Sequence, residues 1–223
     1  MIFKDRAEAG LILAHAMKDS QSWEGALVLG IPRGGVPVAF EVARTLNLPL
    51  DIFMVRKLGV PGYEELAMGA VASGGTLVVN GSVIEEFGIS PETLEAAVQR
   101  EQREIERRER LYREARPPAR IDGRIAIVID DGLATGASML AAVRALRPRA
   151  RQVTVAVPVA ARRTCSELSR EVDQIICANT PRSFVAVGMF YRNFEPTSDE
   201  EVRTLLASSP SDQAVGRNLE EIA

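Results

Sequence analysis

The chain has few of the residues from which several common kinds of catalytic site are built. Its 223 residues include one histidine, two cysteines and three lysines, against 24 arginines. One histidine excludes a histidine-rich metal site and argues against a Ser-His-Asp triad, and His15 lies in a helical pattern where we expect it to be packed or on the surface. Cys165 and Cys177 are not spaced as Cys-x-x-Cys, so we expect two reduced, buried thiols in a cytoplasmic protein.

Long apolar runs and a strong net charge are also missing. No run is long enough to cross a bilayer, and the first six residues lack the apolar core of a signal peptide, so we expect a cytoplasmic protein that does not contact membranes. The net charge of −3 argues against a broad nucleic-acid surface. The length and the hydrophobic content of 46% suffice for one α/β domain with an insertion or a tail.

Strand patterns alternate with helical patterns along most of the chain. The apolar stretches expected to form one sheet are residues 26–30, 50–55, 125–129, 153–159 and 174–178. Helical patterns cover residues 6–17 and 36–46, and this alternation predicts a mainly parallel, doubly wound α/β sheet. Residues 67–72 and 76–80 are predicted to form a hairpin around Gly74 and Gly75. The composition after about residue 207 predicts a flexible tail over residues 208–223.

Residues 91–116 have a different character, because they are rich in charges of both signs. Pairs such as Glu104–Arg108 and Glu109–Arg113 are spaced four residues apart, which favours a helix. A thin apolar stripe predicts that this helix packs along one seam. A dimer contact or a wall over a site remains the functional alternative.

The most informative stretch is residues 125–138, in which an apolar strand pattern ends in Asp130 and Asp131. A loop of small and hydroxyl residues follows, and then a helical pattern. Open α/β sheets bind ligands at the carboxyl ends of their strands, and amides at a helix N-terminus suit a phosphate. The carboxylates would repel that phosphate, so they are expected to contact another part of the ligand, such as sugar hydroxyls. The chain has no Gly-Lys pair, which excludes a P-loop. The purely structural alternative for this stretch is a turn with Asp131 as a helix N-cap.

Residues 128–138 resemble the phosphoribosyl-pyrophosphate (PRPP) motif of type I phosphoribosyltransferases. The resemblance implies that family's fold over residues 1–207 as one domain, with a helical insertion at about 90–118 and a hood at about 178–200. It also implies that Asp130 and Asp131 contact the ribose hydroxyls. The 5′-phosphate would then be bound by the loop residues Ala134, Thr135, Gly136, Ala137 and Ser138.

Two further segments resemble pyrophosphate-binding parts of the family. Residues 30–35, Gly-Ile-Pro-Arg-Gly-Gly, place Arg33 and Gly34 after a strand, and the resemblance predicts a non-proline cis peptide between Pro32 and Arg33. The alternative is an ordinary glycine turn. Residues 56–62 resemble the Arg-Lys loop of adenine phosphoribosyltransferases, so we expect Arg56 and Lys57 to stabilise a leaving pyrophosphate from a mobile loop.

The resemblance near the base is less complete. Residues 184–187, Phe-Val-Ala-Val, resemble the hood of purine phosphoribosyltransferases, which implies that Phe184, Val185 and Val187 line the base pocket; an apolar core strand is the alternative. Two positions depart from the family pattern, since Asn193 and Ala134 stand where 6-oxopurine enzymes carry aspartates. The resemblance of residues 56–62 also makes Glu64 and Glu65 candidates for a contact with the base, and the alternative is that both are solvated acids in a loop.

Together these segments imply transfer of the 5-phosphoribosyl group from PRPP to a purine-like base, with adenine as one candidate, and release of pyrophosphate. Mg²⁺ is implied, held mainly by ligand oxygens and water. Two alternatives stay open: a PRPP- or nucleotide-sensing protein without catalysis, and an enzyme of the reverse or hydrolytic reaction. The identity of the base and a homodimer through the long helix also remain undecided.

Overall fold

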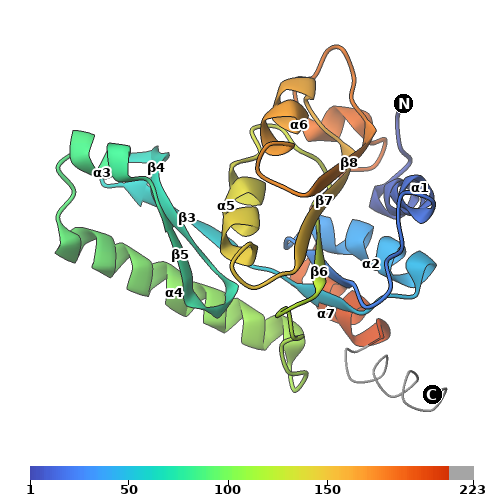
Figure 1. Ribbon diagram of the computed structural model, residues 1–223, viewed down its shortest axis with the longest axis horizontal. Coiled ribbons are helices and arrows are strands. Elements are labelled where there is room, and N and C mark those ends of the chain that lie inside the picture. Colours follow the sequence, from blue (N-terminus) through green and yellow to red (C-terminus); the bar gives the residue numbers. More distant parts are fainter. Residues whose placement is uncertain (211–223) are drawn as a thin grey trace.

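A five-stranded parallel sheet forms the centre of the structure, a computed structural model that describes residues 1–210 (Figure 1). All of its neighbouring strands are parallel, in the order β2-β1-β6-β7-β8. The strands are β1 (Leu27–Gly30), β2 (Leu50–Ile52), β6 (Ile125–Ile129), β7 (Gln152–Val159) and β8 (Gln174–Asn179). The predicted α/β architecture with a mainly parallel sheet is therefore confirmed.

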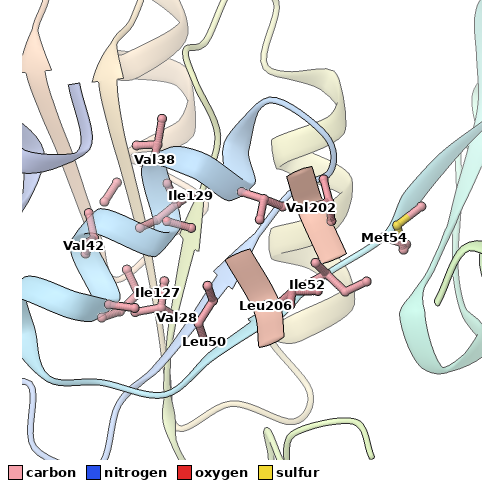
Figure 2. Packing of buried hydrophobic residues seen from close by; sticks show 14 of the residues in the cluster. Val28, Val38, Val42, Leu50, Ile52, Met54, Ile127, Ile129, Val202 and Leu206 are labelled. Atoms are coloured by element: carbon pink, nitrogen blue, oxygen red, sulfur yellow. The ribbon is translucent and has the colours of Figure 1, made fainter. Parts of the chain in front are cut away.

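Both faces of this sheet are buried, as the nearly continuous apolar strand patterns predict. Successive side chains of a strand point to opposite faces, so Ile127 and Ile129 pack into one cluster and Val128 packs into another. Figure 2 shows the first cluster, where helix side chains such as Val38 and Val202 meet the strand residues. Strand β6 thus lies at the middle of the core, and the residues after it are held by a rigid support.

Helices cover the two faces from opposite sides, which makes the sheet doubly wound. One apolar cluster contains buried residues of α1 (Arg6–Lys18), α2 (Gly35–Leu46) and α7 (Asp199–Ser208). The other contains buried residues of α5 (Ala137–Leu146) and α6 (Arg162–Leu168). Helix α1 begins at the N-cap Asp5, whose side chain accepts a hydrogen bond from the amide of Glu8, as N-cap residues do.

A second sheet lies to one side and corrects the expectation for residues 50–62. The predicted strand 50–55 is wrong, because it divides into β2 and the start of β3 (Val55–Val60), which belong to different sheets. Strand β3 pairs antiparallel with β4 (Tyr63–Ala72), and β4 pairs with β5 (Thr76–Val79). Arg56 and Lys57 therefore lie in a strand and not in the expected mobile loop. The predicted hairpin around Gly74 and Gly75 is confirmed, with the short 3-10 turn η1 (Ser73–Gly75) between its strands.

The predicted charged helix is α4 (Pro91–Arg113), which follows the short α3 (Gly81–Glu86) and runs beneath the second sheet in Figure 1. Its apolar stripe packs along one seam, with Ile105 and Tyr112 buried. The i,i+4 pairs Glu104–Arg108 and Glu109–Arg113 both form. Arg113 also reaches the main sheet, where its Nε lies 2.8 Å from Asp51 Oδ1. Helix α4 is thus fixed to both sheets.

Other expectations concern single residues and the C-terminus. No helix within residues 1–210 is long and apolar enough to cross a membrane. His15 is exposed, as expected. Cys165 and Cys177 form no disulfide, but both are half-buried instead of fully buried. Of the predicted tail over 208–223, residues 211–223 lie outside the described part of the chain.

Candidate active site

The candidate site lies where the strand order of the main sheet reverses. From the neighbouring strands β1 and β6, the chain continues outward in opposite directions, to β2 on one side and to β7 on the other. Such a switch point leaves a crevice outside the carboxyl ends of the two strands, where open α/β sheets bind ligands. The loop after β1 and the loop after β6 are the two segments with predicted site residues, and they meet here.

The acid pair leaves β6 at this crevice. Asp130 lines a cavity of about 150 Å³, while the Asp131 amide donates a hydrogen bond of 2.9 Å to Asp130 Oδ1. The rest of the cavity wall comes from the predicted phosphate loop and the hood, including Ala134, Thr135, Gly136, Ala137, Ser138 and Val187. One cavity therefore joins a carboxylate to the loop that the sequence assigns to a phosphate.

The charge of the acid pair is shared unequally. Burial, followed by the negative charge of Asp131, raises the pKa of Asp130 to about 8. Burial also raises the pKa of Asp131, although the neighbouring Arg6 guanidinium opposes this rise. Burial and the neighbouring carboxylate therefore favour the protonated form of Asp130, whereas Arg6 favours the ionised form of Asp131.

Arg6 and Tyr191 complete the surroundings of Asp131, and the sequence analysis missed both. Arg6 Nε and Nη2 each lie 2.9 Å from Asp131 Oδ2. The Tyr191 hydroxyl donates a hydrogen bond of 2.6 Å to the main-chain carbonyl of Asp131. Nothing in the sequence links residue 6 to residue 131, whereas Tyr191 belongs to the hood segment and could have been considered there.

Hydrogen bonds from neighbouring segments fix the predicted phosphate loop. The Leu133 amide donates to the Val159 carbonyl at 2.9 Å, and the Thr164 hydroxyl donates to the Ala134 carbonyl at 2.5 Å. Gly136 has a φ of +73° and precedes the first residue of α5. A Cβ there would lie 2.7 Å from Thr164 Cγ2, so glycine suits both the backbone and the contact. The first amides of α5 have no intrahelical acceptor and can bind an anion.

The loop after β1 lies directly against the acid pair. The peptide between Pro32 and Arg33 is cis, which confirms the prediction. A Cβ on Gly34 would lie 2.2 Å from Asp131 Oδ2, so only glycine allows this approach. Arg33 is exposed, and its Nη1 lies 3.6 Å from Oδ1 of Asp199, an oxygen that also accepts a 2.7 Å hydrogen bond from Tyr112.

Arg56 and Lys57 lie farther along the second sheet and do not line the cavity of Asp130. Arg56 Nε lies 2.8 Å from Glu101 Oε2 of α4. Lys57 lines a cavity of about 330 Å³ together with Ala137 and Ser138 at the start of α5. The structure therefore places Lys57 near the predicted phosphate loop, whereas Arg56 forms an ion pair with the long helix α4.

Of the three predicted hood residues, one lines the cavity of Asp130 and two do not. Val187 lies over Gly132 and lines the cavity of Asp130. Phe184 stacks on Phe190 with ring centroids 5.4 Å apart, and Val185 is 76% exposed. The alternative of an apolar core strand is wrong, because the segment runs into the 3-10 turn η2 (Val187–Phe190).

Glu64 and Asn193 do not line the cavity of Asp130. Glu64 is exposed in β4, and Glu65 belongs to the same strand, so neither lies in a loop. The side-chain oxygen of Asn193 accepts a 3.2 Å hydrogen bond from the Glu195 amide. Within residues 1–210 no group of three or more His, Cys, Asp or Glu side chains could hold a metal ion.

Comparisons with known proteins agree on one family. The family model described as Phosphoribosyl transferase domain matches residues 8–192. Two Mycobacterium tuberculosis proteins, from strains CDC 1551 and H37Rv, carry the name "Putative phosphoribosyl transferase" and are 41% identical over 214 residues. This match covers 96% of this chain but 48% of each relative, so the chain spans about half the length of these curated relatives.

A solved structure matches over nearly the whole chain. The crystal structure of TT1426 from Thermus thermophilus is 40% identical, with a TM-score of 0.85. The match covers 95% of this chain and 100% of that chain.

Proposed function

The chain belongs to the phosphoribosyl transferase family and has its type I fold, and from this membership we propose that it transfers the 5-phosphoribosyl group of PRPP to a nitrogenous base. The observation that carries the proposal is the single cavity shared by Asp130 and the loop of residues 134–138. A phosphate binds at the amides of that loop, while a carboxylate repels phosphate and accepts hydrogen bonds from hydroxyls. A sugar phosphate has both groups at a fixed separation.

In the proposed reaction a ring nitrogen of the base attacks C1 of the ribose. The bond from C1 to the pyrophosphate oxygen breaks, its electron pair leaves with pyrophosphate, and the nitrogen loses its proton to solvent. Positive charge develops on the ribose as this bond breaks. Asp130 and Asp131 orient the ribose hydroxyls and stabilise that charge, because a fixed carboxylate interacts more strongly with the charged transition state than with the neutral sugar.

The leaving pyrophosphate is assigned to the loop after β1 and to the second sheet. Gly34 lets the main chain approach the ligand, and Arg33, Arg56 and Lys57 supply positive charge. Family members use PRPP with Mg²⁺, and the hard oxygens of pyrophosphate and ribose suit this ion. Because the described residues offer no cluster of protein ligands, the pyrophosphate and ribose oxygens would hold the ion, which supplies charge neutralisation when bound.

We assign the acceptor base to the hood. Val187 lies on the cavity wall and would contact the base, with Phe184 and Val185 beside it in the hood. Adenine is the first candidate, and it rests on the resemblance of residues 56–62 and 184–187 to purine enzymes.

The test is pyrophosphate release from PRPP and Mg²⁺ with a panel of acceptors: adenine, hypoxanthine, guanine, xanthine, uracil and orotate. We expect pyrophosphate release with one of these bases. The amount of pyrophosphate should equal the amount of nucleoside monophosphate formed from that base. PRPP binding in calorimetry without release from any base would contradict the transfer and favour a sensing protein. Absence of PRPP binding would contradict the assignment of the cavity itself.

A further inference from the structure

Arg6 joins three segments that are far apart in the sequence. Its Nε and Nη2 contact Asp131 Oδ2, and its Nη1 donates a 2.7 Å hydrogen bond to the main-chain carbonyl of Glu195. The guanidinium carbon also lies 4.0 Å from the centre of the Phe194 ring. All three guanidinium nitrogens are thus engaged, and the side chain is only 12% exposed. This is a built contact and not a chance surface ion pair.

The segment that carries Arg6 is itself fixed to the hood. The Phe3 amide donates to the Phe190 carbonyl, and the Arg192 amide donates to the Phe3 carbonyl, both at 2.8 Å. Asp5 then caps α1, so Arg6 occupies the first turn of a helix whose start is determined. Arg6 reaches Asp131 from a backbone that is held on both sides.

The contact constrains which oxygen of Asp131 can face a ligand. Nε and Nη2 of Arg6 both contact Oδ2, the oxygen that lies against Gly34. The Arg6 contacts to Asp131 both go to Oδ2, so Arg6 leaves Oδ1 for a ligand. Arg6 therefore fixes the carboxylate by one oxygen and leaves the other one for a hydroxyl.

We propose that Arg6 is a positioning residue for phosphoribosyl transfer, which orients Asp131 and keeps it ionised beside Asp130. The inference rests on the proposed function of the same site. Two carboxyl groups on adjacent residues repel each other when both are ionised, and Arg6 offsets that repulsion. Within residues 1–210, the titratable groups that act on Asp131 are Asp130, Arg6 and Tyr191, and Arg6 is the one cation among these three.

The experiment compares Arg6→Gln and Arg6→Lys with the wild type in pyrophosphate release. Arg6→Gln is expected to lower kcat about 10- to 100-fold with a smaller change in the KM for PRPP, because phosphate contacts dominate ground-state binding while the carboxylate acts mainly in the transition state. Arg6→Lys keeps the charge and should recover part of the loss. Arg44→Gln is the matched control, since it removes an exposed arginine that pairs with Glu41.

The pH profile of the rate separates positioning from a merely structural role. Loss of the Arg6 charge should move the acidic limb of kcat/KM to higher pH, because both carboxyl groups then ionise less readily. The limb is compared at a temperature where both proteins stay folded over the whole pH range, so that a change in the folded fraction does not shift it. Wild-type kcat and an unmoved limb in Arg6→Gln would overturn the inference while the proposed function stands.

The wild type distinguishes failure of the inference from failure of the proposed function. If it binds PRPP without releasing pyrophosphate, transfer fails, and the pH dependence of PRPP binding in wild type and Arg6→Gln tests the action of Arg6 on Asp131. An identical dependence in the two proteins would then overturn the inference. If the wild type does not bind PRPP, both the inference and the proposed function are wrong.

Discussion

The crevice at β1 and β6 and the second sheet both contribute predicted site residues, but they hold them in different ways. In the crevice, Asp131 and Gly34 come from short loops after neighbouring buried strands and are in direct contact. In the second sheet, Arg56 pairs with Glu101 of α4. A predicted site residue can thus be positioned by the strand that precedes it or by a distant acid, and only the first arrangement follows from local sequence.

The largest effect on activity is expected in the crevice, from Asp131→Asn. Pyrophosphate release should fall on the order of 10²- to 10³-fold, as for the loss of one electrostatic group in a transition state. The amide oxygen can still accept from Arg6, so the melting temperature should change by only a few degrees. Asp122→Asn serves as the control, because it alters an exposed pair with Arg149. Full activity of Asp131→Asn would remove this carboxylate from the proposed mechanism.

The attachment of the second sheet and α4 can be weakened by Arg113→Met. This change leaves Asp51, which is 2% exposed, buried without its cation. An unpaired buried charge costs about 3–5 kcal/mol, which urea unfolding would measure as a loss of stability. The double variant Asp51→Asn, Arg113→Met removes both charges and should recover part of the loss. A single variant within about 1 kcal/mol of the wild type would show that the pair adds little to the attachment.

The acid pair predicts how the rate depends on pH. Because the pKa of Asp130 is raised to about 8, kcat/KM for PRPP should rise with pH up to about that value. Below it, the rate should fall about tenfold per pH unit if transfer needs the ionised form. A profile that is flat between pH 6 and 9 would contradict this role of Asp130.

Thermal unfolding tests the same pKa independently. The stability of the fold should fall as the pH rises, whereas the rate should increase. The pKa of Asp130 is higher in the folded state than in the unfolded state, where it is about 3.9. This difference stabilises the folded state fully below the unfolded-state pKa, and the stabilisation is lost as the pH rises through about 8. Asp130→Asn should lack this part of the pH dependence.

A smaller effect is expected at Arg56, where the two regions can be compared directly. Arg56→Gln should lower kcat/KM for PRPP about tenfold, the usual loss for one exposed charge-assisted contact of about 1.4 kcal/mol. Glu101→Gln releases the same guanidinium and should leave kcat/KM equal to or above the wild-type value. If Arg56→Gln retains wild-type kinetics, Arg56 acts only in holding α4.

The smallest effect should follow from Glu104→Gln on the solvent side of α4. Arg107 and Arg108 hold the pKa of Glu104 down to about 2, so its stabilisation is present above the unfolded-state pKa of about 4.3 and is lost as the pH falls toward 2. Solvent screens such pairs, and the expected loss at pH 7 is at most about 0.5 kcal/mol. Urea midpoints of the two proteins measure it, and a loss above about 1 kcal/mol would mean that α4 depends on its surface pairs.

Much of the crevice could be predicted because its parts are local. Three neighbouring parts of the sequence build it: the apolar run of β6, the two acids, and the small residues before α5. Burial of the strand places the acids and the loop at the carboxyl end of the sheet. The boundary within residues 50–60 could not be predicted in the same way. Those residues suit a strand throughout, and the division at Phe53 and Met54 comes from pairing, since β2 pairs with β1 while β3 pairs with β4.

The sequence by itself determined the parallel α/β core and the position of the acid pair beside the loop of residues 134–138, because each depends on neighbouring residues. The cis peptide at Pro32–Arg33 was predicted from the resemblance to the family. The tertiary structure alone decided that Arg6 contacts Asp131, that Glu101 holds Arg56, and that Val187 reaches the cavity while Val185 is exposed. These contacts join residues from 45 to 125 positions apart or depend on how one loop is turned. Local patterns carry no information on such pairs, since packing of the whole chain selects them.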